Sequence, residues 1–280
     1  MLTKENILVE DETVRMLKHV DTLDYSENID KLYDLIIEFN KKYDISSLEQ
    51  VTIKDIDLFS ERKGMTISKL EDSKYHHKIE LSMKTFINFY NDQNTPLKNE
   101  ALSIIFHELY HVYDENSLLA SFINNQISDE DFPYYHIGTE YWGEFFSYYK
   151  TRELHITDYP VKQFDKLYSN IRANAENKDL VHRLFYLVSN IIAYSIDNDA
   201  YLNKIRNTNF NYLIKDKNYD ILCFELKNIL SNYPNNLSMM DFINLGKTYC
   251  DLLHHFSYKI CFNKKEMVIT KFTLSDYTPV

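Results

Sequence analysis

The chain has 280 residues, and its 42 acidic and 31 basic residues give a net charge of −11 at pH 7. This negative charge argues against sequence-independent binding to nucleic acids or to anionic membranes, because both need clustered lysine and arginine. Hydrophobic residues make up 44% of the chain, enough for a large core, whereas four glycines leave little material for the glycine-rich loops of nucleotide-binding folds. We therefore expect a folded and mostly helical protein.

Three features predict a cytoplasmic protein. The three cysteines are an odd number without a CxxC spacing, which excludes a disulfide framework and favours a reducing compartment. Residues 1–10 carry charges and lack the apolar core of a signal peptide. The most apolar long segment, 180–196, is interrupted by polar and charged residues, so it does not suit a membrane span.

The first part of the chain predicts one helix followed by a small sheet. Apolar residues recur at helical spacing in 28–43, which is typical of an amphipathic helix. Apolar and polar residues then alternate in 51–59, 65–71 and 77–83, and this period of two predicts three short strands.

Helical patterns dominate the rest of the chain. The next helix is predicted for 96–113, where Pro96 at the first helical position loses no hydrogen bond. Another is predicted for 140–152, after Gly138. Further helical patterns follow in 161–175, 179–206, 218–232 and 238–258. We predict two domains, a mixed α+β domain in 1–156 and a helical one in 157–280.

The predicted helix 96–113 contains the sequence His107-Glu108-Leu109-Tyr110-His111, an HExxH motif. Two histidines four residues apart on a helix are rotated by only about 40° from each other, so both imidazoles can bind one Zn²⁺ ion. Glu108 lies next to that face, where it can take a proton from a metal-bound water. The motif predicts a catalytic zinc site with His107 and His111 as ligands and Glu108 as the general base.

A catalytic zinc site usually has three protein ligands, and the predicted helix 140–152 offers two glutamates for the third position. Glu140 is predicted to lie in the first helical turn, where free N–H groups favour a carboxylate without any metal. Glu144 lies among aromatic residues, where an ionised carboxylate is costly without a partner. We predict Glu144 as the third ligand, with Glu140 as the alternative.

The HExxH motif and a downstream helix with glutamate and aromatic residues resemble the gluzincin metallopeptidases. Over residues 50–155 the chain is similar to the ImmA/IrrE-like metallo-endopeptidases, whose ExxAN-x-FA pattern is closest here to Glu140-x-x-Gly143-Glu144-x-Phe146-Ser147. That alignment favours Glu140 as the ligand, so the choice between the two glutamates stays open. The resemblance implies a zincin-like domain, in which a three-stranded sheet packs on the HExxH helix.

The leading functional hypothesis is a zinc-dependent endopeptidase with one Zn²⁺ per chain, acting on a protein or peptide. The resemblance implies a regulatory protein, such as a transcriptional repressor, as the substrate, and a toxin-like protease differs only in its target. The alternative is a catalytically silent scaffold that binds a protein partner through its helical part. No nucleic acid or membrane is expected as a partner.

Other polar residues are given simpler interpretations. His76 and His77, before the third predicted strand, are expected to be solvated at a strand end, although an edge strand there suits an extended substrate. Cys250 and His254 are expected on a half-buried helix face rather than at a second metal site. The candidates for stabilising an oxyanion are His136, His155, Tyr148 and Tyr149, and the sequence does not choose among them.

Overall fold

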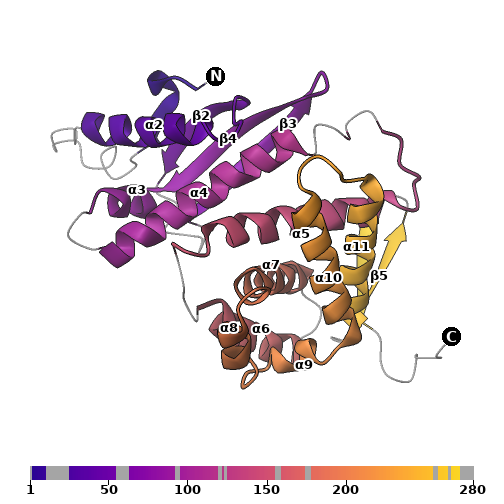
Figure 1. Ribbon diagram of the computed structural model, residues 1–280. Helices are drawn as coiled ribbons and strands as arrows, with labels where there is room; N and C mark the ends of the chain where they lie inside the picture. Colours follow the sequence, from indigo (N-terminus) through magenta and orange to yellow (C-terminus); the bar gives the residue numbers. More distant parts are fainter. Residues whose placement is uncertain are drawn as a thin grey trace. The chain divides into compact units, whose positions relative to one another are not determined.

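The computed structural model describes residues 2–10, 25–54, 63–91, 95–118, 122, 125–154, 159–173, 178–254, 258–263 and 266–271. The fold is α+β, as predicted, and combines a small sheet with many helices (Figure 1). Contacts within the chain divide it into two compact units, Met1–Asn124 with Lys150–His155, and Asn125–Tyr149 with Ile156–Val280. The predicted division into two domains after residue 156 stays a prediction.

The first unit contains a four-stranded sheet, whereas three strands were predicted. Its strands are β1 (Ile7–Glu10), β2 (Leu48–Lys54), β3 (Gly64–Glu71) and β4 (Lys74–Ser82), in the spatial order β1-β2-β4-β3. β1, β2 and β4 run parallel, and β3 pairs antiparallel with β4 at one edge. The unpredicted strand is β1, whose four residues are too few for a clear alternation.

A two-residue turn at Asp72 and Ser73 connects β3 to β4. Both residues have positive φ angles, 47° and 60°, which are typical of the type I′ turn of a tight hairpin. Aspartate tolerates this region better than most residues. No glycine in the described part of the chain has a positive φ. Gly64, Gly138 and Gly246 instead lie where the chain approaches other atoms closely.

The helical elements of the first unit pack with the sheet around one hydrophobic core (Figure 1). They are a 3₁₀ turn at Lys4–Asn6, α2 (Ser26–Asn40), α3 (Met83–Tyr90) and α4 (Thr95–Ser117). α2 contributes Leu32 and Ile36, and α4 contributes Ile105 and Leu109, all buried with apolar residues of β2 and β4. These spacings of four residues place the side chains on one face of each helix. The core thus fixes which face of α4 is turned away from the sheet.

The second unit is built mainly of helices and ends in a hairpin that was not predicted. Its helices are α5 (Phe132–Thr151), α6 (Tyr159–Ala173), α7 (Lys178–Ser195), α8 (Asp199–Ile205), α9 (Asn211–Ile214), α10 (Lys217–Asn232) and α11 (Met239–His254). The predicted helix 179–206 is therefore two helices, and α11 ends before residue 258. β5 (Tyr258–Asn263) and β6 (Glu266–Lys271) form an antiparallel pair, so this part of the chain also contains two strands.

α5 and α11 approach each other most closely at two glycines. A Cβ atom on Gly138 would lie 1.9 Å from the carbonyl oxygen of Phe242, and one on Gly246 would lie 1.9 Å from that of Tyr134. Both distances are far below van der Waals contact, so any other residue would push the helices apart. Gly138 was interpreted as preceding a helix, but it lies inside α5 because packing, not a turn, requires a glycine there.

Candidate metal centre

The two motif histidines lie on adjacent turns of α4, which begins one residue before the predicted start and extends to Ser117. Leu109 is fully buried in the core, and the ring of Tyr110 packs on Phe39 and Tyr43 with centroid distances of 5.0 and 5.2 Å. These contacts fix the rotation of α4 about its axis. His107 and His111 consequently share another face of the helix, where both are half-buried.

The spacing of the two imidazoles fits a zinc ion. Their Nε2 atoms lie 3.1 Å apart, and two nitrogens bound to a tetrahedral metal at about 2.0 to 2.1 Å are separated by about 3.3 Å. The same spacing allows one imidazole to donate its Nε2–H to the other when no metal is bound. Binding a cation through both Nε2 atoms requires each ring to carry its proton on Nδ1.

The motif glutamate is held against the edge strand of the sheet. Glu108 is only 6% exposed, and its Oε2 accepts a hydrogen bond of 2.7 Å from the hydroxyl of Thr66 on β3. The same hydroxyl lies 3.1 Å from the backbone carbonyl oxygen of Glu108. A hydroxyl has a single proton, and the shorter contact to the charged oxygen is the stronger one. Thr66 therefore fixes one oxygen of the Glu108 carboxylate.

The second carboxylate oxygen of Glu108 occupies space that a glycine leaves free. A Cβ atom on Gly64 would lie 2.9 Å from Oε1 of Glu108 and 3.0 Å from Cγ2 of Ile104. Both contacts are closer than carbon atoms normally allow. Gly64 and Thr66 were not predicted to take part in the site. The alternation of apolar and polar residues in 65–71 places Thr66 and Ser68 on the same face of the strand. It does not reveal which helix that face contacts.

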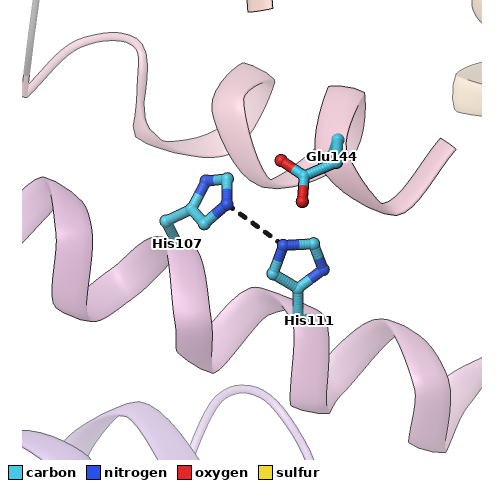
Figure 2. Close-up of side chains that lie close together, drawn as sticks. All are labelled: His107, His111 and Glu144. Carbon is cyan, nitrogen blue, oxygen red and sulfur yellow. Dashed lines mark hydrogen bonds between the residues drawn. The ribbon is translucent and has the colours of Figure 1, made fainter. Parts of the chain in front are cut away.

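A carboxylate completes a group that could hold a metal ion. The candidate ligand atoms of His107, His111 and Glu144 all lie within 4.8 Å of one another, and each residue is half-buried (Figure 2). Two imidazoles and one carboxylate are a common donor set of catalytic zinc sites. Such a set of nitrogen and oxygen donors also accepts other divalent ions, so it does not by itself specify zinc.

The alternative ligand, Glu140, has a different environment from the one predicted. α5 begins at Phe132, so Glu140 lies in the interior of the helix and not in its first turn. Its Oε1 accepts a hydrogen bond of 2.8 Å from the hydroxyl of Tyr186 on α7. Contrary to the prediction, the free N–H groups of a helix start do not stabilise Glu140. A neutral donor, rather than the helix terminus, stabilises this carboxylate within its own unit.

Glu144 lies on α5 beside a buried tyrosine of the same unit. The side chain of Tyr249 on α11 is fully buried, and its hydroxyl lies 2.9 Å from the Oγ atom of Ser189. Burial raises the pKa of Tyr249 well above its ordinary value, and the negative charge of Glu144 adds to this effect. The neighbouring residues Trp142, Phe145 and Phe146 are also buried. Glu144 is thus a carboxylate on a largely apolar helix, as the aromatic sequence predicted.

The interpretation of His77 as a solvated residue is wrong, because its side chain is fully buried. Its Nδ1 lies 2.6 Å from the hydroxyl of Ser47, and its Nε2 lies 3.0 Å from a carboxylate oxygen of Glu115 on α4. His77 lies within β4, which is an inner strand, so the edge strand next to α4 is β3. Only His76 lies near the surface, where it pairs with Glu49 at 2.6 Å.

The structure describes the surroundings of some of the other polar residues named from the sequence, the candidates for stabilising an oxyanion and the pair Cys250 and His254. Tyr149 donates a hydrogen bond of 3.1 Å to Asp197, and His136 is exposed on α5. Cys250 is buried, and burial raises the pKa of its thiol to about 12. His155 and the side chain of His254 lie outside the described part of the chain.

Comparisons of this chain with protein-family models, with curated proteins and with solved structures found no match. None of the helices in the described part of the chain combines the length and the apolar character needed to cross a membrane.

Proposed function

We propose that this protein is a zinc-dependent endopeptidase, with His107, His111 and Glu144 as ligands of one Zn²⁺ ion per chain and Glu108 as the general base. The observation that carries the proposal is the pair of Nε2 atoms 3.1 Å apart on one face of α4. The carboxylate of Glu108, which follows His107 in the same helix, accepts a hydrogen bond from Thr66. The zincin-like packing of the HExxH helix on the sheet, and membership of the gluzincins, belong to the same proposal.

The proposed chemistry assigns a separate task to each residue. Zinc, when bound, supplies a Lewis acid that makes a water acidic enough to lose a proton near neutral pH. Glu108 accepts that proton and later passes it to the nitrogen of the leaving amine, so the peptide bond is replaced by a carboxylate and an amine. His107, His111 and Glu144 hold their positions throughout and neither take nor give a proton.

The edge strand supports a peptide as the substrate class. β3 lies at the end of the strand order, and its outer side pairs with no other strand in the described ranges. An extended peptide can add to such an edge through backbone hydrogen bonds. Ile67 and Leu70 of β3 are 40% and 50% exposed, so apolar substrate side chains would find contacts there. The strand also carries Thr66, which brings such a peptide near Glu108.

The direct test uses the Glu108→Gln variant. Wild-type protein loaded with zinc is incubated with a fluorogenic peptide library, and we expect cleavage that stops on chelation and returns on adding zinc. Glu108→Gln keeps the size of the side chain but removes the base, so we expect at least a hundredfold lower rate. Glu38→Gln is the matched control, because Glu38 is exposed on α2 and pairs only with Lys41 at the surface. Equal rates for the wild type and Glu108→Gln would refute the mechanism.

A further inference from the structure

Two hydroxyl groups on the same face of the edge strand β3 donate hydrogen bonds to carboxylates of α4. Thr66 donates to Glu108 at 2.7 Å, and two residues further along Ser68 donates to Glu115 at 3.0 Å. Residues two apart in a strand point to the same side, and residues seven apart on a helix lie on the same face two turns on. The two bonds are therefore chemically alike. They differ in that only the first holds the side chain of the HExxH motif.

The two oxygens of Glu108 have different surroundings on β3. Oε2 receives the hydroxyl proton of Thr66, so a lone pair of this oxygen is already used. Oε1 lies 2.9 Å from the position that a Cβ atom on Gly64 would take. A carboxylate that is 6% exposed and held in this way has little rotational freedom. Its orientation is thus set by the sequence of β3 and not by α4 alone.

We propose that Thr66 is a positioning residue for the general base. Its hydroxyl holds Oε2 of Glu108, so that Oε1 is the oxygen that accepts the proton from water. Gly64 keeps the space that this orientation needs. The inference rests on the proposed function, because it assigns a role relative to the proton transfer by Glu108. In this proposal β3 orients the carboxylate of Glu108 and also offers the edge to which a substrate peptide can add.

The test compares variants that lose one hydroxyl each. Thr66→Val keeps the shape of the side chain but removes the donor, Thr66→Ser restores the donor, and Ser68→Ala removes the equivalent bond to Glu115. The probe is the peptide that the zinc-loaded wild type cleaves fastest in the library. We expect Thr66→Val to lower kcat about tenfold to a hundredfold with little change in KM, because such supporting bonds have effects of this size. Thr66→Ser and Ser68→Ala should stay within about threefold of the wild type.

A spectroscopic measurement tests the contact without activity. In metal-free protein labelled with ¹³C at glutamate carboxyl groups, the Glu108 resonance is assigned by its loss in Glu108→Gln. At a fixed pH of about 7 we expect Thr66→Val to move this resonance and Thr66→Ser to leave it near its wild-type position, since a donated hydrogen bond polarises the carboxylate. Zinc content per chain should be the same in all three proteins.

The outcomes separate the inference from the proposed function. An unchanged Glu108 resonance in Thr66→Val, or equal losses of kcat in Thr66→Val and Ser68→Ala, would overturn the positioning role while leaving the peptidase intact. Full activity of Glu108→Gln would instead overturn the proposed function, and the inference with it. A lowered kcat that only Thr66→Ser restores, together with the shifted resonance, would support both.

Discussion

The Nε2 atom of His77 lies 3.0 Å from the carboxylate of Glu115, inside a core where the imidazole is fully buried. His77 belongs to an inner strand, β4, and Glu115 to the helix that carries the HExxH motif. On its other side the imidazole meets the hydroxyl of Ser47 at 2.6 Å. One side chain therefore links the loop before β2, the sheet and α4, and helps to fix the position of the helix.

Replacing His77 should destabilise the first unit. We expect His77→Ala to lower the free energy of unfolding by about 3 kcal/mol, because it removes two hydrogen bonds of a buried imidazole and leaves a cavity. His76→Ala removes only a surface pair with Glu49, so a loss below about 1 kcal/mol is expected. Urea unfolding followed by circular dichroism measures both. Equal losses in the two variants would show that the buried network contributes nothing specific.

Packing of the second unit should depend on its closest helix contact. Gly138→Ala places a methyl group 1.9 Å from the carbonyl oxygen of Phe242, so α5 and α11 must separate. We expect a loss of about 3 kcal/mol, at the upper end for overpacking of a core. Thr139→Ala is the matched control on the same helix, since the Thr139 hydroxyl bonds only to carbonyl groups of its own turn. A thermal unfolding midpoint as high in Gly138→Ala as in Thr139→Ala would contradict the close crossing.

Buried thiols should react slowly and in a defined order. Burial raises the pKa of Cys223 to about 11 and that of Cys250 to about 12, against an ordinary value of 9.0. At pH 8 the thiolate fraction should thus be about a hundredfold lower at Cys223, and about a thousandfold lower at Cys250, than in the unfolded chain. We expect iodoacetamide to label both residues faster in urea than in native protein, with Cys250 the slower of the two.

The same shifts predict how stability depends on alkaline pH. Both folded pKa values lie above the unfolded value, so the native chain holds these protons to higher pH than the unfolded chain does. Their contribution to stability is complete below pH 9 and is lost as the pH rises toward 11 and 12.

In the labelling experiment, native labelling of Cys250 at pH 8 as fast as in urea would contradict the burial of its thiol.

Local patterns predicted the elements that carry the site. Pro96 at the first helical position located the start of α4 to within one residue, and alternation located β2, β3 and β4. β1 was not predicted because it is short. The start of α5 was predicted too late because a glycine often marks the end of a helix, whereas Gly138 lies inside α5 and is needed for packing.

The surroundings of the site residues depend on which segments distant in the sequence lie side by side, and local sequence patterns do not show this. His77 is buried because β4 lies between β2 and β3, and only the strand order decides this. Thr66 meets Glu108 because β3 turns back antiparallel through Asp72 and Ser73, a turn without glycine. Neither the inner position of β4 nor the contact of Thr66 could be read from a single segment.

The metal content of the purified chain shows whether the proposed zinc site exists. Protein prepared without chelator is measured by elemental analysis as wild type, His107→Ala, Glu144→Ala and Glu140→Ala. We predict about one zinc per wild-type chain, none in His107→Ala, and a large loss in Glu144→Ala. Glu140→Ala should keep its zinc, because Glu140 accepts a hydrogen bond from Tyr186 and is not a proposed ligand. Wild-type protein that holds no metal and binds none tightly when zinc is added would contradict the proposed zinc site.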